Sequence, residues 1–426
     1  MSCWATLPNR TNLQERMTSS VPSVPVDLFI NAACQRDEPY GDRRSAILGA
    51  PALADASSEI SSWPGYSVTP LHSLQGLAAR LGVGAVDYKD EGGRFGLGSF
   101  KALGGAYAVS RLLRRLVGQR IGKDITTADL LTSPCRELAA GITVTCATDG
   151  NHGRSVAWGA QLFGCRCVIY IHATVSEGRR QAIESYGASV VRTPGNYDDS
   201  VRQADADART NGWHVISDTS YEGYMDVPRD VMQGYQLMVE ESVRQLEQLP
   251  THVFVQGGVG GLAAAVCGYF WERMGAQRPK FIVVEPERAD CLMQSARNGK
   301  VTAVHGNLDT VMAGLACGEV SLLAWEILQA GADAFAVVPD TAAIATMRLM
   351  ADPLPGDPAI VAGESAVAGL AAAIGIAQDD ARRKSLGIDG RSRLLFYGSE
   401  RDTDPELYMR IVGRSGAEVA AAVSAA

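Results

Sequence analysis

The sequence predicts an α/β fold with two lobes, each built on a parallel sheet, and two observations carry this prediction. Short β-rich runs alternate with helical periods between residues 141 and 217. A second set of apolar runs, separated by alanine-rich helical stretches, lies between residues 252 and 397. Regular alternation of strands and helices is typical of parallel sheets covered by helices. Two such sets in a chain of 426 residues predict two lobes.

The expected strands are short and rich in β-branched residues. The first set is GITVTCAT (141–148), CRCVIYIH (165–172), SVVRT (189–193) and WHVIS (213–217). The second set is HVFVQ (252–256), FIVVE (281–285) and RLLFY (393–397). Residues 1–58 show no such pattern, so the sequence predicts an irregular N-terminal extension or a dimer arm there.

Composition narrows the class of protein. A net charge of −8 without a basic stripe argues against a nucleic-acid partner. No apolar run reaches the ~18 residues of a membrane helix, and the N-terminus lacks an apolar signal core. We therefore expect a cytoplasmic protein without a membrane partner. Nine cysteines and six histidines show neither paired Cys-x-x-Cys units nor His-x-x-x-His spacing, so no metal site is predicted.

A glycine-rich stretch, Gly257-Gly258-Val259-Gly260-Gly261, joins an expected strand to an expected helix. Glycines allow a sharp turn with exposed N–H groups, and a helix N-terminus favours an anion, so the stretch predicts a phosphate site. The alternative is a plain tight turn. A second alternative is an NAD site, because Gly258-x-Gly260-x-x-Ala263 fits the dinucleotide pattern and Glu285 ends the next strand.

Lys101 follows Gly98-Ser99-Phe100 and precedes a helical pattern with Val109, Leu112, Leu113 and Leu116 on one face. On the first turn of a buried helix, burial and the positive helix end would both lower the lysine pKa. A neutral amine beside a phosphate site suits a Schiff base with pyridoxal phosphate. The alternative is a lysine whose ammonium simply reaches solvent.

A third stretch, Asp149-Gly150-Asn151-His152-Gly153, also lies between a strand and a helix. Such a turn can hold a carboxylate, and the Asn151 amide suits a phenolate oxygen. His152 is more often a structural residue in this setting. Asp149 has the alternative role of a helix N-cap.

Together, SFKALGGAYAV, TDGNHGR and GGVGG resemble the fold-type II pyridoxal-phosphate enzymes in order and spacing. YSVTPLHSL, SDTSYEGY (217–224), VMAGLACGE (311–319), GESAVAGL (363–370) and DTDPELY (402–408) resemble the diaminopropionate ammonia-lyases of that family. The resemblance covers about residues 60–410. It implies a small domain at 108–224, a discontinuous large domain at 59–107 and 225–426, and a homodimer.

The resemblance also implies roles for individual residues. Lys101 binds the cofactor covalently and Asn151 binds its ring oxygen. The phosphate site comprises Gly257, Gly258, Val259, Gly260 and Gly261. Lys101 and Asp149 act as bases toward the L and D substrates, and Asp218 holds or protonates the leaving amine. The expected reaction is α,β-elimination of 2,3-diaminopropionate to pyruvate and two ammonia.

Three alternatives to this reaction stay open at the sequence level. A serine or threonine dehydratase of the same fold would expel hydroxide, but Asp149 and Asp218 favour a cationic leaving group. A cofactor-binding protein without turnover would not need these two acids. An NAD-dependent oxidoreductase would explain Gly258 and Glu285 but not Lys101 or Asn151.

The sequence departs from the family pattern in one place. Arg401 stands where the family has a glycine before Asp-Thr-Asp. Family members place a hydroxyl near this segment on the pyridine nitrogen. Ser399 is the candidate here, although Gly398 is the alternative occupant of that position. The family also carries a cysteine pair like Cys291 and Cys317, for which free thiols are the expectation in a reducing cytoplasm.

Overall fold

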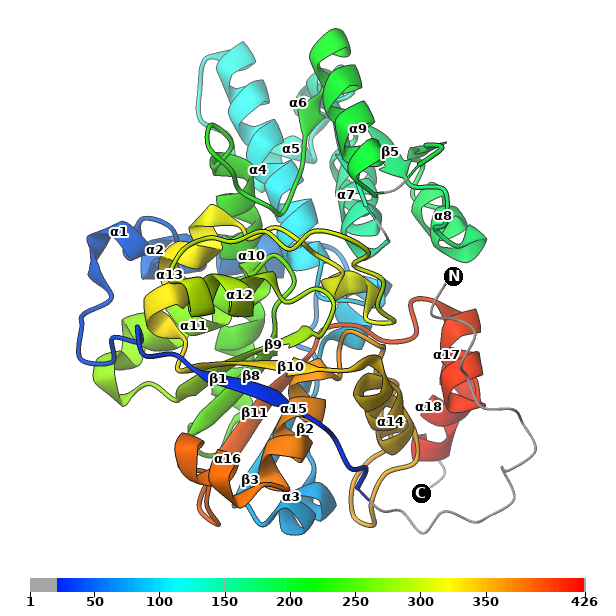
Figure 1. Cartoon of the computed structure of the whole chain (residues 1–426). Coiled ribbons are helices and arrows are strands. Elements are labelled where there is room, and N and C mark those ends of the chain that lie inside the picture. The colour runs from blue at the N-terminus through cyan, green and yellow to red at the C-terminus, as the bar shows by residue number, and fades with distance from the viewer. Residues whose placement is uncertain (1–20, 149, 196, 425–426) are drawn as a thin grey trace.

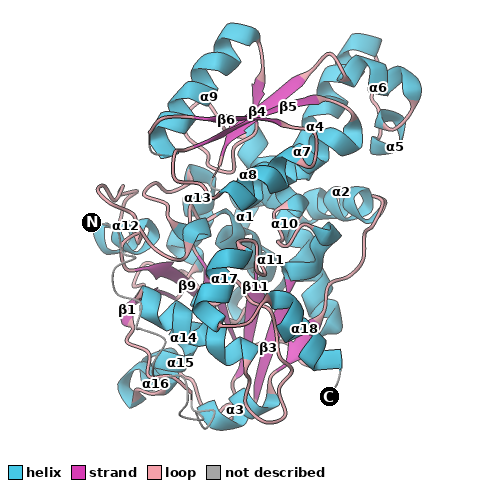
Figure 2. Ribbon diagram, turned by 90° about the vertical axis from the view of Figure 1, so that its right-hand side faces the viewer, coloured by secondary structure: helices cyan, strands magenta, loops and turns pink. Residues whose placement is uncertain are grey.

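The computed structural model describes residues 21–148, 150–195 and 197–424. Two sheets organise the chain, a seven-stranded sheet and a four-stranded sheet. Figure 1 shows helices around both sheets, and Figure 2 shows the four-stranded sheet above the larger one. The predicted α/β architecture with two lobes is confirmed.

The seven-stranded sheet forms the larger lobe. Its strands, in spatial order, are β1 (Asp27–Ile30), β10 (Ala334–Val338), β9 (Lys280–Pro286), β8 (His252–Gln256), β11 (Arg393–Gly398), β3 (Ala85–Asp90) and β2 (Leu71–Ser73). The five inner strands are parallel, whereas the edge strands β1 and β2 pair antiparallel with β10 and β3. The carboxyl ends of β8 and β11 therefore open on the same edge of the sheet.

The four-stranded sheet forms the smaller lobe, and all its strands are parallel. In spatial order they are β6 (Ser189–Arg192), β5 (Arg166–Ile171), β4 (Thr143–Ala147) and β7 (His214–Val215). All four fall inside the range predicted for the small domain, and the larger sheet falls outside it. The exact boundaries at 107/108 and 224/225 stay a prediction.

Helices and short 3-10 turns connect the strands. Before and around the first strands lie α1 (Gly41–Ser45), α2 (Ala50–Ser61), α3 (Gln75–Leu81) and η3 (Glu91–Gly96). Toward and within the smaller lobe lie α4 (Ala102–Ile121), α5 (Thr127–Leu130), α6 (Ser133–Ala139), α7 (Asn151–Phe163), α8 (Glu177–Glu184) and α9 (Tyr197–Asn211). The remainder are α10 (Asp226–Gln245), α11 (Gly261–Met274), η4 (Gly275–Gln277), α12 (Cys291–Asn298), η5 (Ala313–Leu315), α13 (Leu322–Gly331), α14 (Asp340–Ala351), α15 (Ala368–Ala377), α16 (Asp380–Leu386), α17 (Pro405–Val412) and α18 (Gly416–Ser424). Among the described residues, no helix combines the length and the apolar character needed to cross a membrane.

Helix α4 carries the predicted apolar face and joins the lobes. It packs against α7 of the smaller lobe and α10 of the larger lobe. Two glycines in its first turn permit this close approach. A Cβ on Gly104 would lie 2.4 Å from the Tyr235 ring, and a Cβ on Gly105 would lie 2.0 Å from Ser155 Oγ. Any side chain at either position would push the helices apart.

The structure corrects the predictions for the N-terminal segment and for three strands. Residues 21–58 are not an irregular extension, because β1 extends the large sheet and α2 packs against α10 and α4. The sequence analysis also missed β2, β3 and β10. Strand β3 contains Lys89, which is fully buried because Glu241 pairs with it at 2.9 Å. A charged residue at a core position hides the apolar pattern on which strand prediction depends.

Replacement of Glu59 tests the integration of α2 into the fold. The buried Glu59 carboxylate accepts hydrogen bonds from Ser110 Oγ and, at 2.7 Å, from Arg114 Nη1 of α4. Glu59→Ala should lower the free energy of unfolding by about 2–3 kcal/mol, since it leaves both donors without their acceptor. Urea unfolding measures this loss. Ser57→Ala, on the same helix but bonded only to Glu240, is the control and should cost about 1 kcal/mol or less. Equal losses would contradict the proposed anchoring.

Candidate active site

A cavity of about 550 Å³ is lined by residues of both lobes. Among the residues that the sequence analysis singled out, it brings together Lys101, Asn151, His152, Asp218, Gly257, Gly258, Val259, Gly261 and Ser399. Gly260 is adjacent in the chain but does not line the cavity. Asp149 lies outside the described residues. The structure thus gathers side chains that are separated by up to 298 positions along the chain.

Lys101 precedes the first residue of α4 and is held by the segment that follows β11. Ser99 forms a β-bridge with Glu400, and the Phe100 N–H donates to Ser399 O at 3.1 Å. The Lys101 ammonium donates to Asp218 Oδ2 at 2.7 Å. This ion pair connects the larger lobe to the segment after β7 of the smaller lobe.

The predicted lowering of the Lys101 pKa is wrong. Burial does lower this pKa, but the charge of Asp218, reinforced by its hydrogen bond, outweighs burial and raises the pKa above its ordinary value. Burial correspondingly raises the pKa of Asp218, while the Lys101 charge and the nearby His152 hold it well below its usual range. Both groups are therefore charged near neutral pH. The sequence pattern did not show that an anion would face the lysine.

His152 lies beside this ion pair. Its Nε2 is 2.8 Å from the Ile216 carbonyl oxygen, which makes Nε2 the donor in the neutral ring. Its Nδ1 is buried, has no hydrogen-bond partner among the residues that the structure describes, and lies 3.9 Å from Asp218 Oδ2. Burial lowers the pKa of His152, so the ring is neutral at pH 7. The backbone contact agrees with a structural role for one nitrogen, while the other faces the site.

The glycine stretch runs from the end of β8 to the start of α11. The N–H of Gly257 donates to Val284 O, and the N–H of Gly260 donates to Gly257 O. Within the described part of the chain, the N–H groups of Gly258, Val259 and Gly261 donate to no acceptor. Gly258 has φ +61°, a left-handed conformation that favours glycine. Three unpaired N–H groups at a helix N-terminus make an anion site.

Glu285 does not serve as the ribose acid that the NAD alternative requires. Its two carboxylate oxygens accept the backbone N–H groups of Leu292, at 2.9 Å, and Met293, at 2.8 Å, at the start of α12. The side chain is completely buried, and burial raises its pKa to about 8 against these two hydrogen bonds. The NAD interpretation therefore loses the ribose-binding acid that it needs in addition to the glycine pattern.

Arg401 lies in the segment after β11. The Arg401 side chain pairs with Asp402 at 2.7 Å and does not line the cavity. A Cβ on Gly398 would lie 2.4 Å from the Tyr88 ring, so no larger residue fits there. Ser399 does line the cavity. Of the two positions considered, only Ser399 offers a hydroxyl to a bound group.

Sequence reasoning missed several residues of the site. Tyr235 of α10 lines the cavity, and its ring centroid is 5.9 Å from Lys101 Nζ. Glu400 and Arg179 line the cavity as well. Tyr235 has no distinguishing sequence signal, because it belongs to a helical apolar pattern. Glu400 is adjacent to Ser399, which was the available signal.

Cys291 and Cys317 are not joined by a disulfide. The Cys291 thiol instead donates to Gly258 O at 3.7 Å. Burial raises the pKa of Cys291, so its thiol is protonated. For Cys291 this agrees with the expectation of a thiol outside a disulfide.

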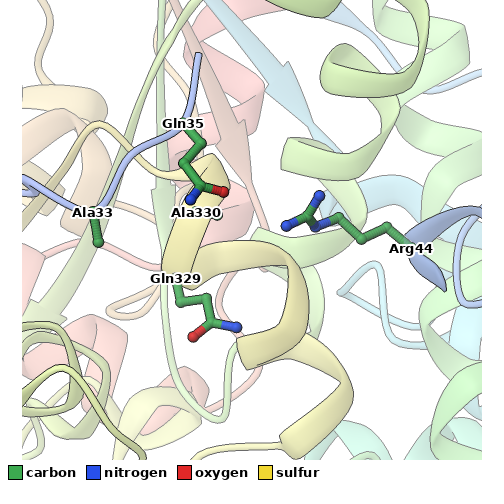
Figure 3. A pocket seen from close by; sticks show the side chains of 5 residues that line it. All are labelled: Ala33, Gln35, Arg44, Gln329 and Ala330. Carbon is green, nitrogen blue, oxygen red and sulfur yellow. The ribbon is translucent and has the colours of Figure 1, made fainter. Parts of the chain in front are cut away.

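A second, smaller cavity of about 240 Å³ lies between the N-terminal segment and α13 (Figure 3). Arg44 is the one charged residue among its five lining residues, which also include Gln35 and Gln329. The Arg44 guanidinium stacks at 4.4 Å over Trp271 and donates to the Tyr40 and Glu326 carbonyls. It anchors the N-terminal segment, and the chemistry of the site lies in the larger cavity.

Comparison with known proteins gives this geometry its context. The model of the family described as pyridoxal-phosphate dependent enzyme matches residues 63–396. The chain belongs to this family. Diaminopropionate ammonia-lyase of Salmonella typhimurium is 41% identical over 366 residues, which cover 83% of this chain and 90% of that enzyme. The family membership confirms the fold-type II prediction.

Two further relatives show that members of the family match this chain over very different lengths. The crystal structure of Escherichia coli diaminopropionate ammonia lyase with an aminoacrylate-PLP azomethine reaction intermediate matches with a TM-score of 0.81 and 35% identity. The match covers 92% of this chain and 98% of that one. The chloroplastic biosynthetic threonine dehydratase of Arabidopsis thaliana is 34% identical over 168 residues, which cover 39% of this chain and 26% of that enzyme. The ammonia-lyases thus match over almost their whole length.

The residues present fit the cofactor of the family. Pyridoxal phosphate needs an amine for its aldehyde, an anion site for its phosphate and a donor for its ring oxygen. The cavity offers Lys101, the three unpaired N–H groups of the glycine stretch and the Asn151 amide. These N–H groups have no acceptor among the described residues, and that observation favours a phosphate-bearing ligand.

Gly258→Asp tests the phosphate site. The substitution places a β-carbon on a left-handed residue and a negative charge beside the unpaired N–H groups. The affinity for pyridoxal phosphate should fall at least ~10-fold, the scale of one lost hydrogen bond to a charged group. Titration of the cofactor-free protein, followed by absorbance, measures the affinity. Gly299→Asp, at φ +66° outside the cavity, carries the same backbone strain and should retain the wild-type affinity.

Asp218→Asn tests the electrostatic control of Lys101. Because Asp218 raises the lysine pKa, its replacement should lower that pKa and make the neutral amine available at lower pH. The pH of half-maximal rate for cofactor capture by the cofactor-free protein should therefore move down. Stopped-flow absorbance over a pH series measures the shift. Asp230→Asn, which removes an acid paired with Arg111 outside the cavity, is the control. An unchanged profile in Asp218→Asn would contradict the assignment.

Proposed function

We propose that the chain catalyses the α,β-elimination of 2,3-diaminopropionate to pyruvate and two molecules of ammonia, with pyridoxal phosphate as cofactor. The two ammonia-lyase relatives, which match over most of both chains, support this substrate. The fit of the cavity to the cofactor supports the reaction class. One molecule of water is consumed, because the released aminoacrylate hydrolyses to pyruvate and the second ammonia.

The ion pair between Lys101 and Asp218 is the observation that carries the substrate proposal. It shows that the Asp218 carboxylate holds an ammonium group inside the cavity, at 2.7 Å. The β-ammonium of 2,3-diaminopropionate is a primary ammonium of the same kind. Once Lys101 is engaged by the cofactor, Asp218 is available for this substrate cation. The hydroxyl of serine carries no charge and gains less from the carboxylate.

A few residues of the cavity have distinct roles in this proposed reaction. Bound pyridoxal phosphate supplies the conjugated system that absorbs the electron pair left by the α-proton. The N–H groups of Gly258, Val259 and Gly261 hold the phosphate, and the Asn151 amide orients the ring. Lys101 Nζ takes the α-proton of the L substrate. Asp218 orients the β-ammonium along the bond that breaks. A second base at Asp149, for the D substrate, stays a prediction from the sequence.

The serine or threonine dehydratase alternative is the second candidate. The same lysine, asparagine and glycine stretch would serve it equally well. Among the described residues, the carboxylate of Asp218 distinguishes the two, since expulsion of hydroxide calls for a proton donor and the low pKa of Asp218 keeps this group ionised. A binding protein without turnover has no use for the ion pair at the cofactor lysine.

A substrate panel tests the proposed reaction. Purified protein is incubated with D- and L-diaminopropionate, serine and threonine, and pyruvate or oxobutyrate is followed. Diaminopropionate should exceed serine in kcat/KM by ~10-fold or more, the scale of one charge-assisted hydrogen bond. Asp218→Asn should reduce this preference more than it reduces turnover of serine. Faster turnover of serine or threonine than of diaminopropionate would favour the dehydratase.

Reductive labelling tests the cofactor lysine. Borohydride treatment of the yellow protein, followed by peptide mapping, should place the cofactor adduct on Lys101. An adduct on another lysine would contradict the assignment of the site.

The sequence further supports a homodimer in the cytoplasm, and the assembly is open to direct measurement. Light scattering should give twice the chain mass of 45.2 kDa. A mass equal to that of one chain would contradict the dimer.

A further inference from the structure

A hydrogen bond between the two lobes crosses the cavity at Asn151. The Asn151 side chain belongs to α7 of the smaller lobe, and Glu400 follows β11 of the larger lobe. Asn151 Nδ2 donates to Glu400 Oε2 at 2.5 Å. Both residues line the cavity. The residue that is assigned to the cofactor ring is thus in contact with a buried carboxylate that has no role in the proposed chemistry.

Glu400 is itself fixed in place. Only 4% of the residue is exposed. Its Oε1 accepts the backbone N–H of Ser365 at 3.0 Å, and its Oε2 also accepts Thr403 Oγ1 at 3.4 Å. With Asn151, three donors converge on the two oxygens of this side chain. A rigid acceptor is well suited to define the orientation of its partner.

The chemistry of an amide explains how this contact fixes the orientation of the Asn151 side chain. An asparagine side chain presents a donor on one side and an acceptor on the other, and the two orientations are nearly equal in shape. A carboxylate accepts the Nδ2 hydrogens but repels Oδ1. With one Nδ2 hydrogen bound to Glu400, the second remains available for the ring oxygen of the cofactor. In the flipped orientation, Oδ1 would face the carboxylate.

We propose that Glu400 is a positioning residue that fixes the amide of Asn151 with its nitrogen toward the cofactor ring oxygen. This inference rests on the proposed function, because it takes Asn151 to be the ring-oxygen partner. It assigns no contact between Glu400 and the substrate. Since the two residues come from different lobes, the correct orientation of the amide also requires that the lobes be closed on one another.

Glu364 is the matched control for this role. It is another buried glutamate of the same region, with 1% of the residue exposed, and the charge of Glu400 acts on it. Its Oε1 accepts a hydrogen bond from Arg179 Nη2 at 3.0 Å. Within the described part of the chain, the Asn151 amide donates to Glu400 and not to Glu364. Burial raises the pKa of Glu364 to about 8. Glu364→Gln therefore changes little charge at pH 7 and leaves the amide of Asn151 with its partner.

A double-mutant cycle on the holoenzyme tests the proposal. The variants are Asn151→Ala, Glu400→Ala and the combination, with Glu364→Gln alone and with Asn151→Ala. Two quantities are measured without substrate: the affinity for pyridoxal phosphate and the ratio of the absorption bands of the bound cofactor. That ratio reports the protonation of the ring oxygen and of the Lys101 nitrogen, so a purely structural role would not move it.

Each single alanine variant should weaken cofactor affinity by roughly 10-fold and shift the band ratio in the same direction. The double variant should match Asn151→Ala, because residues that act through one another are not additive. Glu364→Gln should keep the wild-type ratio, and its effect on affinity should add to that of Asn151→Ala. Glu400→Gln keeps most of the volume but presents an amide nitrogen that donates to Asn151 Oδ1 in the flipped orientation, so it should also shift the ratio and tests the proposal even if Glu400→Ala does not fold.

Other results would overturn the proposal. A Glu400→Ala holoenzyme with the wild-type band ratio, beside an altered Asn151→Ala, would show that the amide orients without Glu400. Full additivity of the two changes would show that Glu400 acts independently of Asn151. A wild-type band ratio in Glu400→Gln would show that the amide takes its orientation without the carboxylate. A wild-type protein without a cofactor band would instead overturn the proposed function itself.

Discussion

An ammonium group inside a partly closed cavity needs a fixed counter-charge, and Asp218 provides it for Lys101. The cost of removing a charge from water makes an unpaired lysine at this place unfavourable. The pair also connects the two lobes, since Lys101 is held by the segment after β11 and Asp218 follows β7. The position of the two sheets relative to one another is therefore coupled to the charge state of the site. In the proposed function, the cofactor and a cationic substrate engage the same two partners.

The buried carboxyl groups near the cavity show how burial and charged neighbours together set a pKa. Glu285 and Glu364 both have a pKa raised to about 8 by burial. Glu285 nevertheless holds the start of α12, and Glu364 faces Arg179 of the smaller lobe. Asp218, beside an ammonium group, has its pKa held low. Glu364 has an opposite charge as well, in Arg179 at 3.0 Å, but burial and the charge of Glu400 outweigh it.

Strand prediction succeeded where apolar runs were uninterrupted and failed where tertiary partners compensated for polar residues. HVFVQ and RLLFY mark the strands β8 and β11 that open onto the site. No comparable apolar run marks β3, in which Lys89 is buried against Glu241. The edge strand β1 is only four residues long and pairs with β10 alone. Short edge strands depend on a neighbour distant in the chain, so local pattern carries little information about them.

The sequence by itself determined the α/β class, and it predicted the glycine stretch, Lys101 and the asparagine turn as the candidate cofactor site, because each depends on local backbone chemistry or on a motif of fixed spacing. Only the tertiary structure decided the charge of Lys101, since the sequence cannot show that an aspartate 117 positions later faces it. It likewise decided that Glu285 is buried against α12 and that Arg401 turns away from the cavity. The contact of Glu400 with Asn151 joins residues 249 positions apart. The pKa values and orientations of groups in the site depend on contacts through space, and those contacts exist only after the two lobes have come together.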